Sequence, residues 1–226
     1  MQSVIFRDRI DAAKKLVVRL YWLKDEIQEN KSPAVIVAIP RGGVIIGDVI
    51  ASELGVKLDL VVSRKIGAPS NSELAIGAVM PNGSYFLNEV ADMINVSQDY
   101  IESQINKEVK EIDRRLIDFR GSRNYDNELE GKLAVLVDDG IATGATMLAS
   151  ARWIKEKHNC KKLVIAVPVA PREILEDLNN IADKVIVLYT PEPFGAVGRF
   201  YQDFNQVSDE EVKEITKKYL HNTPNN

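Results

Sequence analysis

The stretch LAVLVDDGIATGATMLAS, residues 133–150, decides the fold because it joins three features in one short segment. A short continuous apolar run, 133–137, is typical of a buried strand. Two adjacent acids, Asp138 and Asp139, end the run, and a loop rich in Gly and Thr follows. Helical spacing then resumes from about Ala145 to His158. This order predicts a strand, a ligand-binding loop and a helix, one after the other.

The same alternation of apolar runs and helical spacing extends along the chain. Runs typical of strands occupy 33–40, 57–63, 74–79, 84–88, 132–137, 162–169 and 184–189. Patterns typical of helices occupy 7–29, 44–55, 97–119 and a C-terminal segment of about 208–220 that opens with the capping-box pair Ser208 and Glu211. Continuous Val/Ile/Leu runs separated by helices predict an α/β fold with an open, mostly parallel sheet and helices on both faces.

Composition limits the class of protein. The chain has 226 residues, 45% of them hydrophobic and 27% charged, which favours one folded domain over 1–226. Its net charge of −4 argues against binding nucleic acid or an acidic membrane. The single Cys160 cannot form an internal disulfide, which suits a reducing compartment. The start of the sequence does not resemble a signal peptide, and no apolar run reaches the ~18 residues of a membrane span. We therefore expect a cytoplasmic protein.

The loops that follow the predicted strands carry the unusual residues. They are PRGG (40–43), RKIGAPSNSE (64–73), DDGIATGAT (138–146) and TPEPFGAVGRFYQDF (190–204). Open parallel sheets bind ligands beyond the carboxyl ends of their strands, where these loops would lie. Glycine lets backbone amides approach a ligand and Arg or Lys neutralises it, so the loops indicate a ligand with several phosphates.

The loop after 133–137 has two chemical halves. Gly140, Gly144 and their small neighbours leave amides open at a helix N-terminus, which favours a phosphate. The two acids would repel a phosphate, so we expect them to face hydroxyl groups or a divalent cation. A sugar phosphate satisfies both halves. A Walker P-loop is disfavoured because the loop has no Lys. A dinucleotide-binding loop is disfavoured because G-x-G-x-x-G occurs nowhere in the chain. A plain helix cap would explain only one of the two acids.

The segment VLVDDGIATGAT resembles the motif that binds phosphoribosyl pyrophosphate (PRPP) in type I phosphoribosyltransferases. AIPRGGVIIG resembles the pyrophosphate loop of that family, and VVSRKIG resembles the strand and basic turn before its flexible catalytic loop. The resemblance covers about 33–190 and is closest to prokaryotic phosphoribosyltransferase-domain proteins whose acceptor is unassigned. It implies the type I fold with a small hood, formed by the N-terminal helix, by 190–206 or by both.

The resemblance also implies a role for individual residues. Asp138 and Asp139 would hold the ribose hydroxyls, and Arg41 with Gly42 would contact pyrophosphate. Lys65, together with Arg64, would reach the same leaving group or would come from a dimer neighbour, and 67–77 would form the lid. The expected catalytic residues are Lys65, Arg41 and Asp139. The loop residues expected to wrap the 5′-phosphate are Gly140, Ala142, Thr143, Gly144, Ala145 and Thr146.

The resemblance further implies a phosphoribosyl transfer that releases pyrophosphate, in nucleotide metabolism. Mg²⁺ would be bound mainly through PRPP, with no site made by protein side chains alone, and the protein would be a homodimer. The acceptor would be a nitrogenous base, with Phe194, Phe200 or Tyr201 as candidates to stack on it. Ala142 replaces an aspartate found in hypoxanthine-guanine enzymes, which argues against that chemistry. A sensor of PRPP or nucleotides, with little catalysis, is the alternative, followed by chemistry on a non-base acceptor.

Overall fold

A computed structural model describes residues 4–29, 33–125 and 128–220. The helices are α1 (Arg9–Leu20), α2 (Trp22–Glu29), α3 (Gly42–Leu54), α4 (Glu89–Met93), α5 (Gln98–Arg120), α6 (Ala145–Lys157), α7 (Leu175–Ile181) and α8 (Asp209–Leu220). The strands are β1 (Ala34–Ala38), β2 (Lys57–Leu60), β3 (Arg64–Ala68), β4 (Asn71–Val79), β5 (Tyr85–Leu87), β6 (Leu133–Val137), β7 (Lys162–Val169) and β8 (Lys184–Tyr189). Three short 3₁₀ turns, η1 (Pro81–Gly83), η2 (Arg172–Ile174) and η3 (Val197–Phe200), complete the described elements.

The main sheet has the strand order β2-β1-β6-β7-β8, and every neighbouring pair is parallel. Its central strand β6 is buried along its whole length. The register pairs Ala38 with Val137, so β1 and β6 end side by side. The loops that leave these two strands, PRGG and DDGIATGAT, therefore start next to each other at the carboxyl edge.

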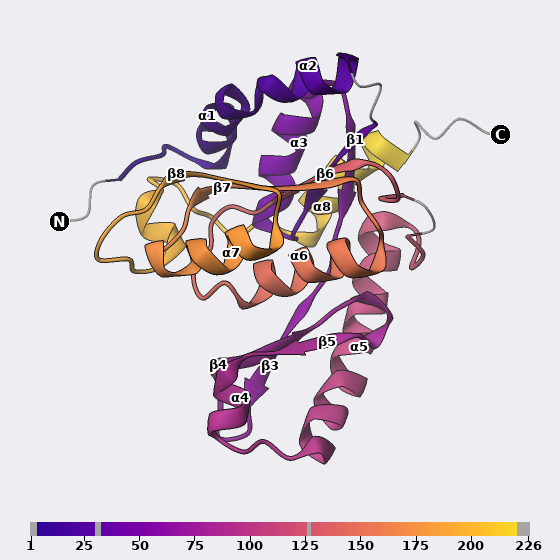
Figure 1. Ribbon diagram of the computed structural model, residues 1–226, viewed down its shortest axis with the longest axis vertical. Coiled ribbons are helices and arrows are strands. Elements are labelled where there is room, and N and C mark those ends of the chain that lie inside the picture. The colour runs from indigo at the N-terminus through magenta and orange to yellow at the C-terminus, as the bar shows by residue number, and fades with distance from the viewer. Residues whose placement is uncertain (1–3, 30–32, 126–127, 221–226) are drawn as a thin grey trace.

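Helices cover both faces of this sheet (Figure 1). α1 packs against α3 on one face, and α6 packs beside α7 on the other. Buried side chains form two clusters, one on each side of the sheet, because each strand alternates its side chains between the two faces. The predicted α/β class with a parallel sheet covered on both faces is confirmed.

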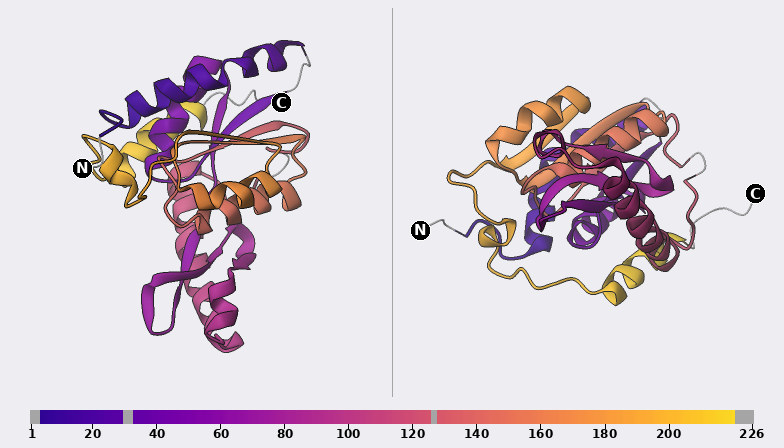
Figure 2. Two further views of the ribbon diagram at one scale, coloured as in Figure 1. Left: turned by 60° about the vertical axis from the view of Figure 1, so that its left-hand side comes forward. Right: turned by 90° about the horizontal axis from the view of Figure 1, so that it is seen from below.

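A second, antiparallel sheet of three strands, β3-β4-β5, projects from this body together with α4 (Figures 1 and 2). The long helix α5 begins at the far end of this lobe and returns to the body, where it ends beside β2. We call residues 64–120 the lobe. A small unit beside the main sheet was expected, but not from these residues. The prediction that the N-terminal helix and 190–206 form a hood over the site stays a prediction.

Several predicted elements differ in the structure. The stretch 64–73, expected as a loop, forms β3 and the start of β4, because its backbone pairs with later residues as far as Arg64 with Val79. The predicted strands at 74–79 and 84–88 belong to this antiparallel sheet and not to the parallel one. The helix expected over 7–29 is interrupted at Tyr21, which separates α1 from α2.

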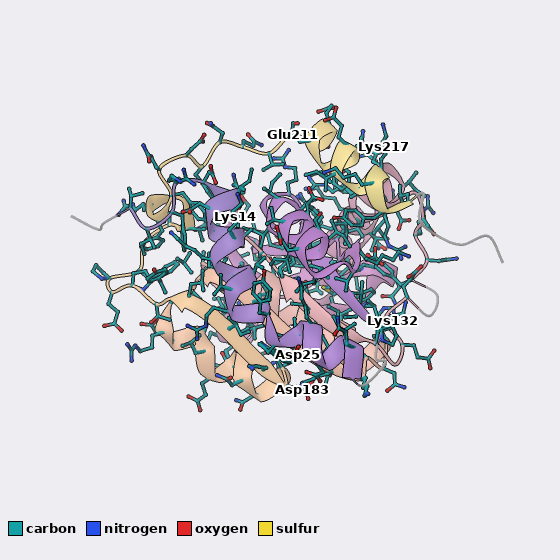
Figure 3. All side chains as sticks on the ribbon, turned by 90° about the horizontal axis from the view of Figure 1, so that it is seen from above. Lys14, Asp25, Lys132, Asp183, Glu211 and Lys217 are labelled. Carbon is teal, nitrogen blue, oxygen red and sulfur yellow. The ribbon has the colours of Figure 1, made fainter. Side chains whose placement is uncertain are left out.

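The caps predicted for two helices are present. Gly55 ends α3 with a left-handed backbone, φ 69°. Ser208 Oγ accepts from the Glu211 amide at 3.1 Å, and the Glu211 carboxylate accepts from the Ser208 amide at 2.7 Å. Glu211 lies in the first turn of α8 and Lys217 in the last, so acidic and basic charges match the helix dipole (Figure 3). No helix among the described residues is long and apolar enough to cross a membrane.

Candidate functional site

The acid pair lies where the PRGG loop meets the end of β6. The backbone of Gly42 is so close to the carboxylate of Asp139 that an added Cβ would lie 1.8 Å from Oδ2. A Cβ on Gly43 would lie 3.0 Å from Cα of Asp138. The two glycines let the start of α3 pack directly against the acids. The Pro40–Arg41 peptide bond just before them is cis.

The loop 140–146 connects the acids to α6. Gly144 takes φ 81° at the N-cap of α6, and an added Cβ there would lie 2.4 Å from Ile174 Cδ1. Both its conformation and its surroundings therefore require glycine. Ala142 and Thr143 are exposed, whereas Ala145 and Thr146 are half-buried in the first turn of α6. The amides of this turn lie at the positive end of the helix dipole, as a phosphate site requires.

Burial opposes the ionisation of both acids. It raises the pKa of Asp138 well above its ordinary value, and the neighbouring Asp139 carboxylate raises it further. Burial also raises the pKa of Asp139, while Arg9 acts in the opposite direction. Asp138 Oδ1 accepts from the Asp139 amide at 2.8 Å. The pair is thus a concentrated, partly buried source of hydrogen-bond acceptors.

An ion pair that the sequence did not indicate holds Asp139. Arg9, the first residue of α1, donates from Nε to Asp139 Oδ2 at 2.8 Å, and its side chain is only 11% exposed. Tyr201 donates its hydroxyl to the Asp139 carbonyl at 2.6 Å. Helical spacing in 7–29 gave no reason to separate Arg9 from the other charges of that helix. The burial of Arg9 beside Asp139 can be recognised only in the folded structure and not from the sequence.

The other predicted cations lie farther from the acids or face other partners. Arg41 Nη1 donates to Asp209 Oδ1 at 3.3 Å, at the start of α8. Arg64 Nε donates to Glu108 Oε2 at 2.8 Å, and this pair lies within the lobe. Lys65 follows on β3 and is exposed. The structure thus brings Gly42 against the acid pair, pairs Arg41 with Asp209, and places Arg64 and Lys65 on the lobe.

The aromatic candidates for base binding pack against the protein. Phe200 is fully buried and Tyr201 is 4% exposed. The Tyr201 ring lies 5.2 Å from that of Phe6 and 4.9 Å from that of Phe204. Phe194 is half-buried, 5.2 Å from Phe200. Packing accounts for Phe200 and Tyr201 without a ligand, and a base-stacking role for any of the three stays a prediction.

A cavity of about 450 Å³ opens beside the loop, between the lobe and α6. Thr143 and Ala145 line it from the loop, and Phe86 and Asn88 line it from the lobe. Its size is within the range of small-molecule sites. Another cavity, of about 340 Å³ between β2 and α8, lies away from the acids. Among the described residues, no group of three or more His, Cys, Asp and Glu side chains could hold a metal ion.

Fold and site together define a protein with a parallel-sheet body and, at its carboxyl edge, an acid pair followed by a Gly/Thr loop that leads into a helix. Residues 8–197 match the family model of the phosphoribosyl transferase domain. The chain belongs to this family, as the sequence resemblance predicted.

Two relatives show how far the similarity extends. The chain is 38% identical over 209 residues to Rv0571c of Mycobacterium tuberculosis, which is named provisionally as a phosphoribosyl transferase. The match covers 92% of this chain but 45% of that protein, so the chain spans less than half the length of its curated relative. The crystal structure of TT1426 from Thermus thermophilus superposes with a TM-score of 0.77 at 35% identity, over 95% of this chain and 99% of that one.

Proposed function

We propose that the protein transfers 5-phosphoribose from PRPP to a nitrogenous acceptor, a nucleobase, with release of pyrophosphate. The observation that carries this proposal is the packing of the PRGG loop on the acid pair, with Gly42 against Asp139 and Gly43 against Asp138. This contact joins a pyrophosphate type of loop to a ribose type of loop. Family membership supports the same reaction.

Each half of PRPP has matching groups in this arrangement. The Asp138 and Asp139 carboxylates would accept from the ribose 2′- and 3′-hydroxyls. The 5′-phosphate would lie against the amides that begin α6, with Thr143 and Thr146 as hydroxyl donors. Pyrophosphate would lie near Arg41 and the amide of Gly42.

The reaction needs charge stabilisation at the leaving group. Breaking the bond from C1 to pyrophosphate leaves positive charge on the ribose and a highly charged anion, so cations aimed at that anion lower the barrier. Mg²⁺ bound through PRPP would neutralise part of the diphosphate charge. This fits the structure, because the two carboxylates add negative charge close to the place proposed for the diphosphate. The protein itself would supply Arg41, and Lys65 would approach from the lobe.

The acceptor must lie on the opposite side of the ribose, in line with the leaving group and away from water. Ala142 has no side chain that could serve as a general base, so a 6-oxopurine reaction that needs one is disfavoured. Residues 190–206 remain the proposed acceptor-binding segment, with Phe194 as its half-buried aromatic. A homodimer and residence in the cytoplasm are proposals on the grounds given from the sequence.

The test is the release of pyrophosphate from Mg²⁺–PRPP in the presence of pooled purine or pyrimidine bases. The blank is the variant with Asp138→Asn and Asp139→Asn. Release that depends on one pool and disappears in the blank would support the transfer and name the acceptor class. Absence of release with every pool would contradict the transferase proposal.

Lys65 gives a more specific prediction within this assay. Because it would act on the departing pyrophosphate, Lys65→Ala should lower turnover by roughly a hundredfold and leave PRPP affinity nearly unchanged. The matched control is Lys107→Ala, another exposed lysine of the lobe. Turnover and calorimetric PRPP affinity are measured for both variants. Equal loss of turnover and affinity in Lys65→Ala would contradict the role.

A further inference from the structure

Arg9 joins three segments of the chain at the acid pair. Its Nε donates to Asp139 Oδ2 at 2.8 Å, and its Nη1 donates to the main-chain oxygen of Asn205 at 2.8 Å. The guanidinium carbon lies 3.9 Å from the centre of the Phe204 ring, a cation–π contact. A guanidinium supplies both directed bonds and the flat face for stacking, which an ammonium does not.

The backbone on both sides of Arg9 is anchored. Asp8 caps α1 by accepting from the Asp11 amide at 2.7 Å. The preceding residues pair with the end of η3 and the segment that follows it, because the Phe6 amide donates to the Phe200 carbonyl at 3.0 Å. In return, the Asp203 amide donates to the Arg7 carbonyl at 2.8 Å. The guanidinium is therefore held in one place before any ligand arrives.

This contact fixes one oxygen of Asp139. Oδ2 lies between Arg9 Nε and the backbone of Gly42, where no additional atom fits. A carboxylate offers about four acceptor positions over its two oxygens, so one bond from Arg9 leaves acceptors for a ligand. The carboxylate thus has a defined rotation when it meets a hydroxyl group, and less orientational freedom is lost on binding.

The positive charge of Arg9 also favours the form of Asp139 that binds hydroxyl groups. The titratable and charged groups that act on Asp139 are Asp138, Arg9 and the Tyr201 phenol. Burial favours the protonated form of Asp139, and Arg9 opposes it. An arginine stays charged at any pH at which the protein is folded. A protonated Asp139 would lose acceptor capacity toward ribose hydroxyls.

We propose that Arg9 is a positioning residue of the PRPP site, holding the Asp139 carboxylate in the orientation that accepts a ribose hydroxyl. This inference rests on the proposed function. It assigns a role to the N-terminal helix and explains the segment FYQDFN, 200–205, as the support of Arg9 and Asp139. Phe204 stacks on the guanidinium, Asn205 accepts from it, and Tyr201 holds the Asp139 backbone.

The experiment is calorimetric titration of the full chain with Mg²⁺–PRPP, alongside thermal unfolding of every variant. Arg9→Gln should weaken PRPP affinity by roughly tenfold to a hundredfold, because it leaves a buried carboxylate without its charged partner. Arg9→Lys should recover part of the affinity, since it restores the charge but not both bonds. Phe204→Leu, which keeps Arg9 and removes the ring that contacts both Arg9 and Tyr201, should give a smaller loss. The matched control is Arg19→Gln, an exposed arginine of α1, with affinity within about twofold of the wild type.

The outcomes separate this inference from the proposed function. Absence of PRPP binding by the wild type would overturn the proposed function itself. Wild-type binding that Arg9→Gln leaves unchanged would overturn the role of Arg9 alone. Affinity losses in Arg9→Gln, Arg9→Lys and Phe204→Leu that merely follow their losses of thermal stability would also overturn it, because Arg9 would then support folding and not the orientation of Asp139.

Discussion

Asp138 and Asp139 meet opposing demands at the scale of single residues. Ligand binding needs ionised carboxylates, whereas burial and mutual repulsion raise the pKa of Asp138 well above its ordinary value. Keeping such a pair ionised in the folded protein lowers its free energy of unfolding. The effect of burial on stability can be measured at Asp138, for which the described part of the chain offers no ion-pair partner as close as Arg9 is to Asp139.

Asp138→Asn should raise the free energy of unfolding at pH 7, because burial and the neighbouring Asp139 carboxylate disfavour the ionised form of Asp138 in the folded protein. The amide oxygen can still accept from the Asp139 amide. Because the folded protein holds a proton on Asp138 more tightly than the unfolded chain, wild-type stability falls as pH rises from the ordinary value of 3.8 through the raised pKa. Urea unfolding from pH 4 to 8 should therefore show a gap between variant and wild type that widens with pH. A gap constant over this range would contradict the assigned titration.

At the scale of elements, the PRGG loop works because α3 begins with two glycines. Alanine is a better helix former than glycine by ~1 kcal/mol, so Gly42→Ala would stabilise α3 if space allowed. An added Cβ would instead lie 1.8 Å from Asp139 Oδ2 and 3.0 Å from Arg9 Nε. The clash should displace the carboxylate and outweigh the helix propensity.

We therefore expect Gly42→Ala to lower the melting temperature and to reduce PRPP affinity at least tenfold. Glu53→Ala, an exposed change in the last turn of the same helix, is the control and should alter neither. Thermal unfolding and PRPP titration of both variants check this. A Gly42→Ala protein as stable and as tight-binding as the wild type would contradict the packing described at the site.

The elements that could be predicted from sequence are those whose local pattern matches their final environment. The strands β1, β6, β7 and β8 of the parallel sheet contain continuous apolar runs, and the start of α8 carries its own capping box. β3 could not be predicted, because RKIGA has two charged residues, two small residues and a single Ile, and becomes a strand only through pairing with β4. The lobe as a separate sheet was missed for the same reason.

The same reasoning separates the site residues that were found from those that were missed. The acids and glycines of 138–146 lie in one continuous motif, and PRGG is a second motif of that kind. Arg9 and Phe204 are far from both in sequence and meet Asp139 only through the packing of α1 and 200–205. A contact between segments so far apart produces no motif in the sequence, so it could not be predicted.

At the scale of the whole molecule, a buried ion pair joins the lobe to the body. Arg120, at the end of α5, donates from Nε to Asp59 Oδ1 at 2.6 Å and from Nη2 to Oδ2 at 3.0 Å. Both residues are at least nine-tenths buried, and the guanidinium lies 4.0 Å from the centre of the Tyr125 ring. Because Asp59 belongs to β2, this pair fixes the helix that carries the lobe.

Arg120→Leu should destabilise the protein by about 3–5 kcal/mol, because it leaves a buried carboxylate uncompensated. Adding Asp59→Asn should recover much of this loss, since the amide is neutral and can still accept from the Leu60 amide, as Asp59 does at 2.8 Å. The surface pair of Arg123 with Asp113, 3.3 Å apart, serves as control, and Arg123→Leu should cost less than ~1 kcal/mol. Chemical denaturation measures all three. A double variant no more stable than Arg120→Leu would show that the pair acts through something other than charge.

The central claim is that the acid pair, the PRGG loop and the start of α6 form one PRPP site. Calorimetric titration of wild type, Asp139→Asn and the exposed control Asp25→Asn with Mg²⁺–PRPP tests it most directly (Figure 3 labels Asp25 on α2). We predict one PRPP bound per chain, affinity about tenfold weaker in Asp139→Asn because an amide accepts from a hydroxyl less strongly than a carboxylate, and no change in Asp25→Asn. Wild type that fails to bind PRPP, or Asp139→Asn that binds it as tightly as wild type, would contradict the account.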